Sequence, residues 1–293
     1  MSVVALPAPE ATAAHHWVLT FTCVDRPGIV HAVSGACVAA GGNITELQQF
    51  SSTDTGHFFL RLEVETSLDE PAFAARVTPV AETFGAQFEI VEVGRRLRTL
   101  VLATKAGHCL NDLLFRERTG HLPIEVPLVL ANHDDLRELV GFYGVGFESH
   151  TVTPETKADF EARVREVVRD EGIELVVLAR YMQILSPELC SFLEGRAINI
   201  HHSFLPGFKG ANPYRQAHQR GVKLIGATAH FVTSDLDEGP IIEQNVVRVD
   251  HTRTVAQLVA IGQDEESRTL TSAVQLFAER RVFRDGVRTV IFR

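Results

Sequence analysis

The chain has 293 residues, of which 45% are hydrophobic and 22% are charged. This composition is typical of a globular protein with one large domain or two ordinary ones. Acidic residues outnumber basic ones by 37 to 28, and the formal net charge of −9 disfavours a protein that binds nucleic acid by neutralising phosphates. The sequence contains no apolar run long enough to span a bilayer, so we expect no membrane partner.

The cysteines and the N-terminus bear on the cellular compartment. Cys23, Cys37, Cys109 and Cys190 are scattered, without a C-x-x-C pair. The first residues, MSVVALPAPEATAAHHW, lack the charged start and sustained apolar core of a secretory signal. We therefore expect a cytoplasmic protein whose cysteines fill the core as small apolar side chains.

The first third of the chain predicts a small α/β domain after a flexible tail at residues 1–14. The pattern predicts strands over 16–24, 43–52, 56–65 and 86–93, a helix that ends at Gly41-Gly42, and a helix over 69–85. This β-α-β-β-α-β order is that of a ferredoxin-like fold, to which we assign residues 15–93.

The turn after the first strand begins a motif, DRPGIVHAVSGACVAAGGNI. Pro27 suits a first helical turn, Asp25 can cap exposed N–H groups, and Gly28 allows a close approach of backbone or ligand. The stretch resembles the ACT family of small-molecule-sensing domains over residues 17–93. That resemblance implies a regulatory or oligomerisation domain, a homo-oligomer, and an amino-acid effector near Asp25, Gly28 and Asn43. A role of these residues in shaping the turn alone is an equal alternative.

The rest of the chain, after a linker at 94–98, alternates short apolar strands with helices. The pattern predicts strands over 99–105, 125–133 and 173–182, and helices over 108–115, 134–144 and 157–172. This alternation implies a Rossmann-like, doubly wound and mostly parallel sheet over residues 99–293.

Polar side chains stand at the end of one predicted strand, AINIHH. Alternation places Asn199 and His201 on one face, and Ile198 and Ile200 on the other. If the later turn with Asp237 folds back over this strand end, an amide, an imidazole and a carboxylate converge. Asn and protonated His can stabilise an oxyanion, and a carboxylate can hold the imidazolium and position or deprotonate a nucleophile. Each residue alone also fits a structural role, as a loop cap, a buried histidine or a turn aspartate.

The strand is followed by SFLPGFKG, and the later turn reads LDEGP. This combination closely resembles the formyltetrahydrofolate-dependent formyltransferase family over about residues 98–249. The matching residues are Asn199, His201, Ser203, Leu205, Pro206, Gly210, Leu236, Asp237, Gly239 and Pro240. The resemblance implies that Asn199, His201 and Asp237 are the catalytic trio. His202 stands where relatives vary, and we place it outside the trio.

A folate pocket is implied by the same resemblance, because ARYMQILSPE is similar to the family loop whose backbone holds the pterin ring. Substrate-binding roles are implied for Met182, Gln183, Ile184, Leu185, Ser203, Gly210 and Asp235. A buried strand end is the competing explanation for the apolar members. The two roles are compatible, since a flat ring needs apolar walls and a few backbone partners.

The segment LATKAGHCLNDLL distinguishes among members of the family. Members that formylate a phosphate-bearing amine have a glycine-rich loop there, whose N–H groups can cradle the phosphate. This chain has one glycine, with Lys105 and His108 beside it. Members that formylate tRNA add a C-terminal nucleic-acid-binding domain, whereas here only a short strand-like segment follows the last apolar pattern. The arrangement resembles that of the family's hydrolytic members, in which water replaces the amine.

The resemblance therefore implies an enzyme that hydrolyses 10-formyltetrahydrofolate to tetrahydrofolate and formate, balancing one-carbon pools and supplying formate for purine synthesis. It also makes glycine and methionine the effectors to test. We expect no prosthetic group and no metal, because the histidines lack a ligand spacing and the adjacent pair His201-His202 should point to opposite faces of a strand. Two alternatives are a formyltransferase that acts on a small amine and a non-catalytic folate or amino-acid sensor.

Overall fold

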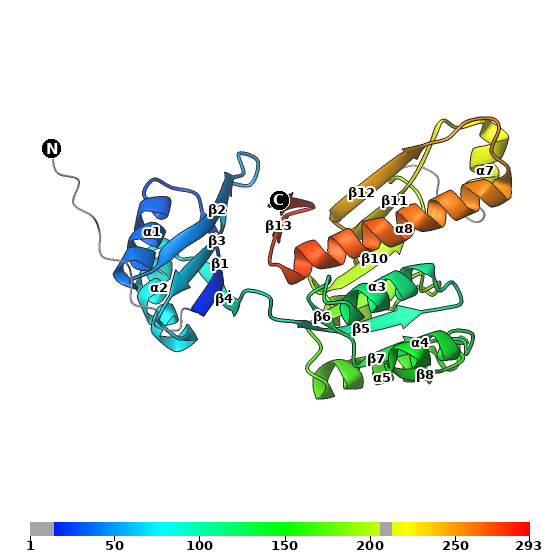
Figure 1. Ribbon diagram of the computed structural model, residues 1–293, viewed down its shortest axis with the longest axis horizontal. Coiled ribbons are helices and arrows are strands. Elements are labelled where there is room, and N and C mark those ends of the chain that lie inside the picture. Colours follow the sequence, from blue (N-terminus) through cyan, green and yellow to red (C-terminus); the bar gives the residue numbers. More distant parts are fainter. Residues whose placement is uncertain (1–14, 206–212) are drawn as a thin grey trace. The chain divides into compact units, whose positions relative to one another are not determined.

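The structure is a computed structural model that describes residues 15–205 and 213–293. The chain divides into two compact units, the first ending at Gly94 and the second beginning at Arg95. Figure 1 draws the elements of both units. The tail predicted at 1–14 and the substrate-binding role predicted for Gly210 lie outside the described residues.

The first unit has the predicted βαββαβ order. Its elements are β1 (His15–Val24), α1 (Ile29–Ala39), β2 (Asn43–Ser51), β3 (His57–Thr66), α2 (Glu70–Phe84) and β4 (Gln87–Glu92). The strands form an antiparallel sheet in the order β2-β3-β1-β4, with α1 and α2 against one face (Figure 1). Apolar side chains such as Phe21, Val33, Leu60 and Phe73 fill the core between the helices and the sheet. Burying one such side chain stabilises the unit by about 1.5–3 kcal/mol. Because burial is this favourable, the alternation of apolar residues in the strands predicted the unit well.

The start of α1 differs from the prediction. Gly28 is the N-cap residue, with φ of 99° and no side-chain capping bond. Pro27 precedes the helix, and no backbone N–H of the described residues donates to the Asp25 side chain, so the helix-starting and capping roles given to these residues are wrong. The left-handed backbone at Gly28 is the physical reason, because glycine alone adopts it without strain. By contrast, the side chain of Asp69 caps α2 as a normal N-cap.

The second unit contains the longer α/β alternation. Its elements are β5 (Leu97–Ala103), α3 (His108–Arg118), β6 (Ile124–Glu125), β7 (Leu128–Ala131), α4 (Arg137–Tyr143), β8 (Gly146–Ser149), α5 (Lys157–Asp170), β9 (Leu175–Ala179), α6 (Pro187–Phe192), β10 (Ala197–His201), α7 (Pro213–Arg220), β11 (Leu224–Phe231), β12 (Ile241–Arg248), α8 (Val255–Ala278), β13 (Val282–Asp285) and β14 (Arg288–Ile291). The strand predicted over 125–133 is interrupted at Pro127, which lacks an N–H for the ladder. The buried Leu97 already belongs to β5, so the predicted linker at 94–98 overlaps the strand.

The central sheet of this unit has the order β12-β11-β10-β9-β5-β7-β8, with β6 beside β5. The pairs from β8 to β10 are parallel, and β11 and β12 add antiparallel neighbours at one side. The predicted doubly wound, mostly parallel sheet is therefore confirmed. One apolar cluster joins the sheet to α3 and α8, and another joins its other face to α5 and α6.

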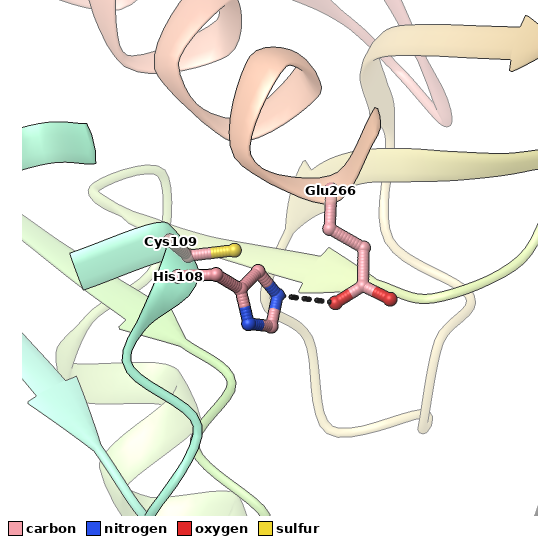
Figure 2. Close-up of side chains that lie close together, drawn as sticks. All are labelled: His108, Cys109 and Glu266. Carbon is pink, nitrogen blue, oxygen red and sulfur yellow. Dashed lines mark hydrogen bonds and ion pairs between the residues drawn. The ribbon is translucent and has the colours of Figure 1, made fainter. Parts of the chain in front are cut away.

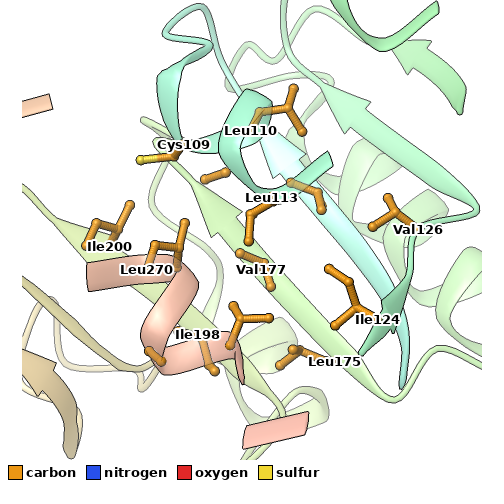
Figure 3. Packing of buried hydrophobic residues seen from close by; sticks show 14 of the residues in the cluster. Cys109, Leu110, Leu113, Ile124, Val126, Leu175, Val177, Ile198, Ile200 and Leu270 are labelled. Carbon is orange, nitrogen blue, oxygen red and sulfur yellow. The ribbon is translucent and has the colours of Figure 1, made fainter. Parts of the chain in front are cut away.

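Strand β10 separates these two faces residue by residue. Ile198 and Ile200 belong to the cluster with Leu113 of α3 and Leu270 of α8 (Figure 3). The odd-numbered positions of β10 turn to the opposite face, as alternation predicted. There α6 is short, and the polar end of the strand is left beside a cavity.

Helix α8 is the longest described helix, with 24 residues. It begins with a capping box in which Thr254 and Gln257 satisfy each other's backbone N–H groups. Its inner face combines apolar residues with the buried carboxylate of Glu266. Within residues 15–205 and 213–293, neither α8 nor another helix is both long and apolar enough to cross a lipid bilayer.

Candidate active site

A cavity of about 270 Å³ lies where β9 and β10 end and the turn after β11 folds back. Side chains that follow parallel strands gather at this edge of an α/β sheet, where ligands normally bind. The turn returns over the sheet because Gly239 packs against the Phe231 carbonyl, where an added Cβ would lie 1.7 Å from the oxygen. The Phe231 N–H also donates to the Pro240 carbonyl at 2.9 Å. This turn is therefore shaped by a close backbone approach that requires glycine.

The structure brings Asn199, His201 and Asp237 to this cavity. His201 Nδ1 lies 3.2 Å from Asp237 Oδ2. A fourth residue, His230, contacts both Asn199 and Asp237: its Nε2 lies 3.3 Å from Asn199 Nδ2 and 3.6 Å from Asp237 Oδ1. The amide, the imidazole and the carboxylate thus face one small volume.

Asp237 is held as a carboxylate by the two imidazoles. The hydrogen bond with His201, and then that with His230, lowers the pKa of Asp237 far below its ordinary value despite partial burial. The residue has φ of 59°, a left-handed conformation that aspartate tolerates better than most residues. An ionised carboxylate that faces a cavity can accept a proton or a hydrogen bond from a nucleophile.

His201 has one ring nitrogen that is used and one that is free for a ligand. The residue is 7% exposed, and its Nε2 is buried without a hydrogen-bond partner among the described residues. Leaving a buried polar atom unpaired costs about 1–3 kcal/mol. Such a cost is accepted at sites where a ligand supplies the missing partner.

His230 is a site residue that the sequence reasoning missed. Its Nδ1 donates to the Phe231 carbonyl at 2.9 Å, which leaves Nε2 directed toward Asn199 and Asp237. Neutral His230 accepts from the Asn199 amide, and protonated His230 faces the carboxylate. Each form therefore bonds to one of the two groups at a time, and at least one N–H of Asn199 stays available. Alternation in ATAHF could have nominated it, but the pairing of Asn199 with His230 is set by the β10–β11 register.

The residues predicted to hold the pterin ring, Met182, Gln183, Ile184 and Leu185, line the same cavity. Leu185 is 8% exposed, whereas Met182 and Ile184 are 57% and 61% exposed. The Met182 N–H donates to Thr104 Oγ1 at 2.9 Å, which ties this loop to the end of β5. The loop therefore offers apolar surface on an anchored backbone.

Two other predicted substrate-binding residues do not line this cavity. Ser203 is buried, and its carbonyl accepts from Thr228 Oγ1, which also accepts from the Leu205 N–H. Asp235 is exposed, and its carbonyl accepts from Thr233 Oγ1 at 2.9 Å. Both residues shape the segments that carry the trio.

The predicted effector residues are exposed in the first unit. Asp25 and Gly28 lie in the turn between β1 and α1, and Asn43 begins β2. The Asp25 N–H donates to the Gly56 carbonyl at 2.8 Å, which joins this turn to the β2–β3 turn. All three residues remain accessible to a ligand.

The rings of His201 and His202 do not point to opposite faces, so that expectation is wrong. Their centroids are 4.9 Å apart with an interplanar angle of 21°, a stacked arrangement. The reason is that β10 ends at His201, so His202 leaves the strand alternation.

A second cluster of donors, His108, Cys109 and Glu266, lies where α3 meets α8 (Figure 2). Glu266 is 1% exposed, and its two oxygens already contact Tyr214 Oη at 2.6 Å and His108 Nε2 at 2.8 Å. Arg180 Nε lies 3.3 Å from the same carboxylate and its charge disfavours a cation there. Burial, reinforced by Glu266, raises the pKa of the Cys109 thiol, and a thiol is a poor metal ligand. We therefore interpret the cluster as a buried polar network.

The sequence and fold are similar to known proteins in both units. Residues 97–274 match the formyl transferase family model, and residues 17–78 match the ACT domain model. A formyltetrahydrofolate deformylase of Corynebacterium sp. (strain P-1) is 49% identical over 281 residues, which cover 94% of this chain and 98% of that relative.

Similar solved structures match either almost the whole chain or only part of it. A formyltetrahydrofolate deformylase of Burkholderia mallei is 49% identical, with a TM-score of 0.92 over 95% of this chain and 100% of the other. Glycinamide ribonucleotide transformylase 1 of Symbiobacterium toebii is 35% identical, with a TM-score of 0.64 over 69% of this chain and 97% of its own. These likenesses confirm the two resemblances predicted from the motifs, and the chain belongs to the formyltetrahydrofolate deformylase family.

Proposed function

We propose that this chain hydrolyses 10-formyltetrahydrofolate to tetrahydrofolate and formate, and that Asn199, His201 and Asp237 perform the reaction. Membership of the deformylase family supports the substrate. One observation carries the residue roles: His201 contacts the Asp237 carboxylate through Nδ1 while its buried Nε2 has no partner among the described residues.

The proposed mechanism begins with a water molecule that donates a hydrogen bond to the Asp237 carboxylate. Its oxygen attacks the formyl carbon as Asp237 helps to remove a proton. The free N–H of Asn199 and a proton on His201 Nε2 stabilise the oxyanion that develops. The C–N bond then breaks, the folate nitrogen receives a proton through His201 or water, and formate leaves. The balance is one water consumed and one C–N bond hydrolysed, with no prosthetic group or metal in any step.

We place the folate ring against the loop of Met182, Gln183, Ile184 and Leu185. The loop is anchored at Thr104 and presents apolar side chains beside the trio. A flat heteroaromatic ring needs such walls and a few backbone partners. The formyl group then lies next to Asn199 and His201.

We also propose that the ACT unit binds a small amino acid, with glycine and methionine as candidates, and that copies of the chain associate. Asp25, Gly28 and Asn43 are exposed and offer a carboxylate, an open backbone and an amide. Association is supported by β2, an edge strand of its sheet with Leu47 and Phe50 38% and 46% exposed. Sedimentation of the full chain tests association.

The deciding experiment measures formate release from purified protein and 10-formyltetrahydrofolate without an amine, with Asp237→Asn as the comparison. Asparagine keeps the left-handed backbone while it removes the charge. Formate release that depends on Asp237 supports the proposal. Formate or formyl transfer that appears only after an amine is added makes the chain a transferase, and folate binding without turnover under either condition makes it a sensor.

A further inference from the structure

We propose that His202 is a water-positioning residue of this site and that Arg180, held by Glu266, sets the tautomer in which it acts. The inference rests on the proposed hydrolysis. It concerns a residue outside the trio, and its structural part can be tested without turnover.

The contact between Arg180 and His202 determines the ring's protonation pattern. Arg180 Nη1 lies 2.7 Å from His202 Nδ1. A guanidinium group only donates hydrogen bonds, so Nδ1 must accept. The proton of the neutral ring is therefore on Nε2, which makes Nε2 a donor and excludes His202 as a general base at either nitrogen.

The position of Arg180 is set by its backbone conformation and by its contact with Glu266. It has φ of 61° directly after β9, an uncommon conformation for a long side chain. Its Nε lies 3.3 Å from Glu266 Oε2, and because this nitrogen makes no hydrogen bond with the described residues the contact is one of charge with charge. His108 contacts the same oxygen of Glu266, and Tyr214 donates to the other oxygen. This buried anion offsets the charge of Arg180.

The charge on Glu266 is maintained by its partners. Burial raises the pKa of Glu266, but the hydrogen bond with His108, the charge of Arg180 and the hydrogen bond with Tyr214 outweigh it, so that the net pKa is lowered. The network in Figure 2 thus continues, through Arg180, to His202. It links α8 to the catalytic end of β10.

His202 lies at the reaction centre rather than beside it. Its ring stacks on that of His201, and it lines the same cavity as Asn199 and Asp237. Burial, then the charges of Arg180 and His201, lowers its pKa to about 4, against opposing effects of Glu266 and Asp237. A neutral ring beside His201 adds no repulsion when His201 is protonated.

The free Nε2–H has a specific use in hydrolysis. An amine acceptor brings its own binding groups, whereas water has only two protons and two lone pairs. Asp237 accepts from one water proton, and a donor to one lone pair leaves the other lone pair for attack. Asn199 and His201 already serve the oxyanion, so we assign the His202 Nε2–H to the attacking water.

The first test is the tautomer, measured by ¹⁵N NMR on full-length protein with labelled histidine, the His202 signal being identified from His202→Phe. Wild type should show protonation at Nε2 and none at Nδ1 at pH 7. Arg180→Met should lose this fixed pattern, and Arg180→Lys, which still donates, should retain it. Protonation of His202 at Nδ1 in wild type overturns the inference, whatever the protein's activity.

The second test separates kcat from KM in formate release. His202→Phe keeps the stacked ring but has no donor, and kcat should fall about 100-fold with KM within about threefold of wild type. His202→Gln places an amide N–H near the Nε2 position and should recover part of the loss. A kcat for His202→Phe within twofold of wild type overturns the water-positioning role. If wild type releases no formate, the proposed function is refuted, and the water-positioning role is refuted with it. The NMR result still decides the tautomer of His202 in that case.

Discussion

At the residue scale, the neighbours of Asp237 set both the position and the charge of its carboxylate. Its left-handed backbone places the carboxylate between His201 and His230, and both imidazoles favour the ionised form. The turn itself depends on Gly239, which has no room for a Cβ. Position and charge are therefore set by different residues, and the two can be altered separately.

We expect the effects of Asp237→Asn and His201→Ala on catalysis to be non-additive. Because the proposed roles are performed by a contacting pair, each change should lower kcat/KM by about 10³-fold, and the double variant should fall little further. The measurement is kcat/KM for formate release in the four proteins of the cycle. Two large losses that multiply fully in the double variant contradict a paired role.

His202 should make the stability of the protein depend on pH. Its folded pKa is lowered to about 4, chiefly by burial and Arg180 and despite Glu266 and Asp237, whereas its ordinary value is 6.5. Between these values the unfolded chain binds more protons, so the free energy of unfolding falls as the pH drops from about 7 to 4. Between pH 7 and pH 5, wild type should lose about 2 kcal/mol more than His202→Phe.

Urea unfolding followed by circular dichroism at the two pH values measures this difference. The comparison with His202→Phe cancels the contribution of the other histidines. Equal losses in the two proteins would mean that His202 titrates normally in the folded state.

At the element scale, α7 and α8 meet at a position where only glycine fits. An added Cβ on Gly262 would lie 2.1 Å from Tyr214 Oη, the hydroxyl that donates to Glu266. The glycine of α8 thus permits the contact that holds the buried carboxylate. Packing between helices and polar order in the site depend on the same residue.

Gly262→Ala should therefore lower the free energy of unfolding by about 1–3 kcal/mol, since the Tyr214 ring must move. Gly141 in α4 is the matched control, because an added Cβ there meets nothing within 4 Å. Gly141→Ala should stabilise the protein by about 0.5–1 kcal/mol through the better helix propensity of alanine. Chemical unfolding of both variants checks the pair, and similar destabilisation by the two would contradict the steric explanation.

At the scale of the whole molecule, one chain contains an ACT unit and a formyl transferase unit. Each has its own apolar core and its own sheet. The proposed effector residues and the proposed catalytic residues belong to different units. Any effect of an amino acid on formate release is then a coupling between two sites.

We expect glycine or methionine to change kcat/KM for formate release by about 5-fold or more, a typical coupling between sites. Asp25→Asn and Asn43→Ala in the full chain should abolish the response and leave the basal rate unchanged. Glu82→Gln, an exposed change on α2, is the control and should keep the response. A response that persists in both variants would place the effector elsewhere.

Local patterns in the sequence were sufficient for most of the fold. Alternation and helical spacing predicted the βαββαβ unit and the mostly parallel sheet, because burying one face of each element is the main stabilising effect. They name no helix over the segment that forms α8. They also miss β8, α6 and α7, which have four, six and eight residues. Elements this short contain too few turns or alternations for a period to be recognised. The start of α1 was misjudged because a left-handed glycine, rather than a side chain, ends the preceding turn.

The sequence by itself determined which polar groups stand at the ends of strands. Asn199 and His201 share one face of a strand, and Asp237 stands in a turn with glycine and proline. Only the tertiary structure decided which distant groups meet them. His230 faces Asn199 through strand register, and Arg180 joins His202 to Glu266 on α8, which is remote in the chain. The physical reason is that periodicity records which face of an element is buried, whereas contacts between polar side chains depend on how separate elements pack.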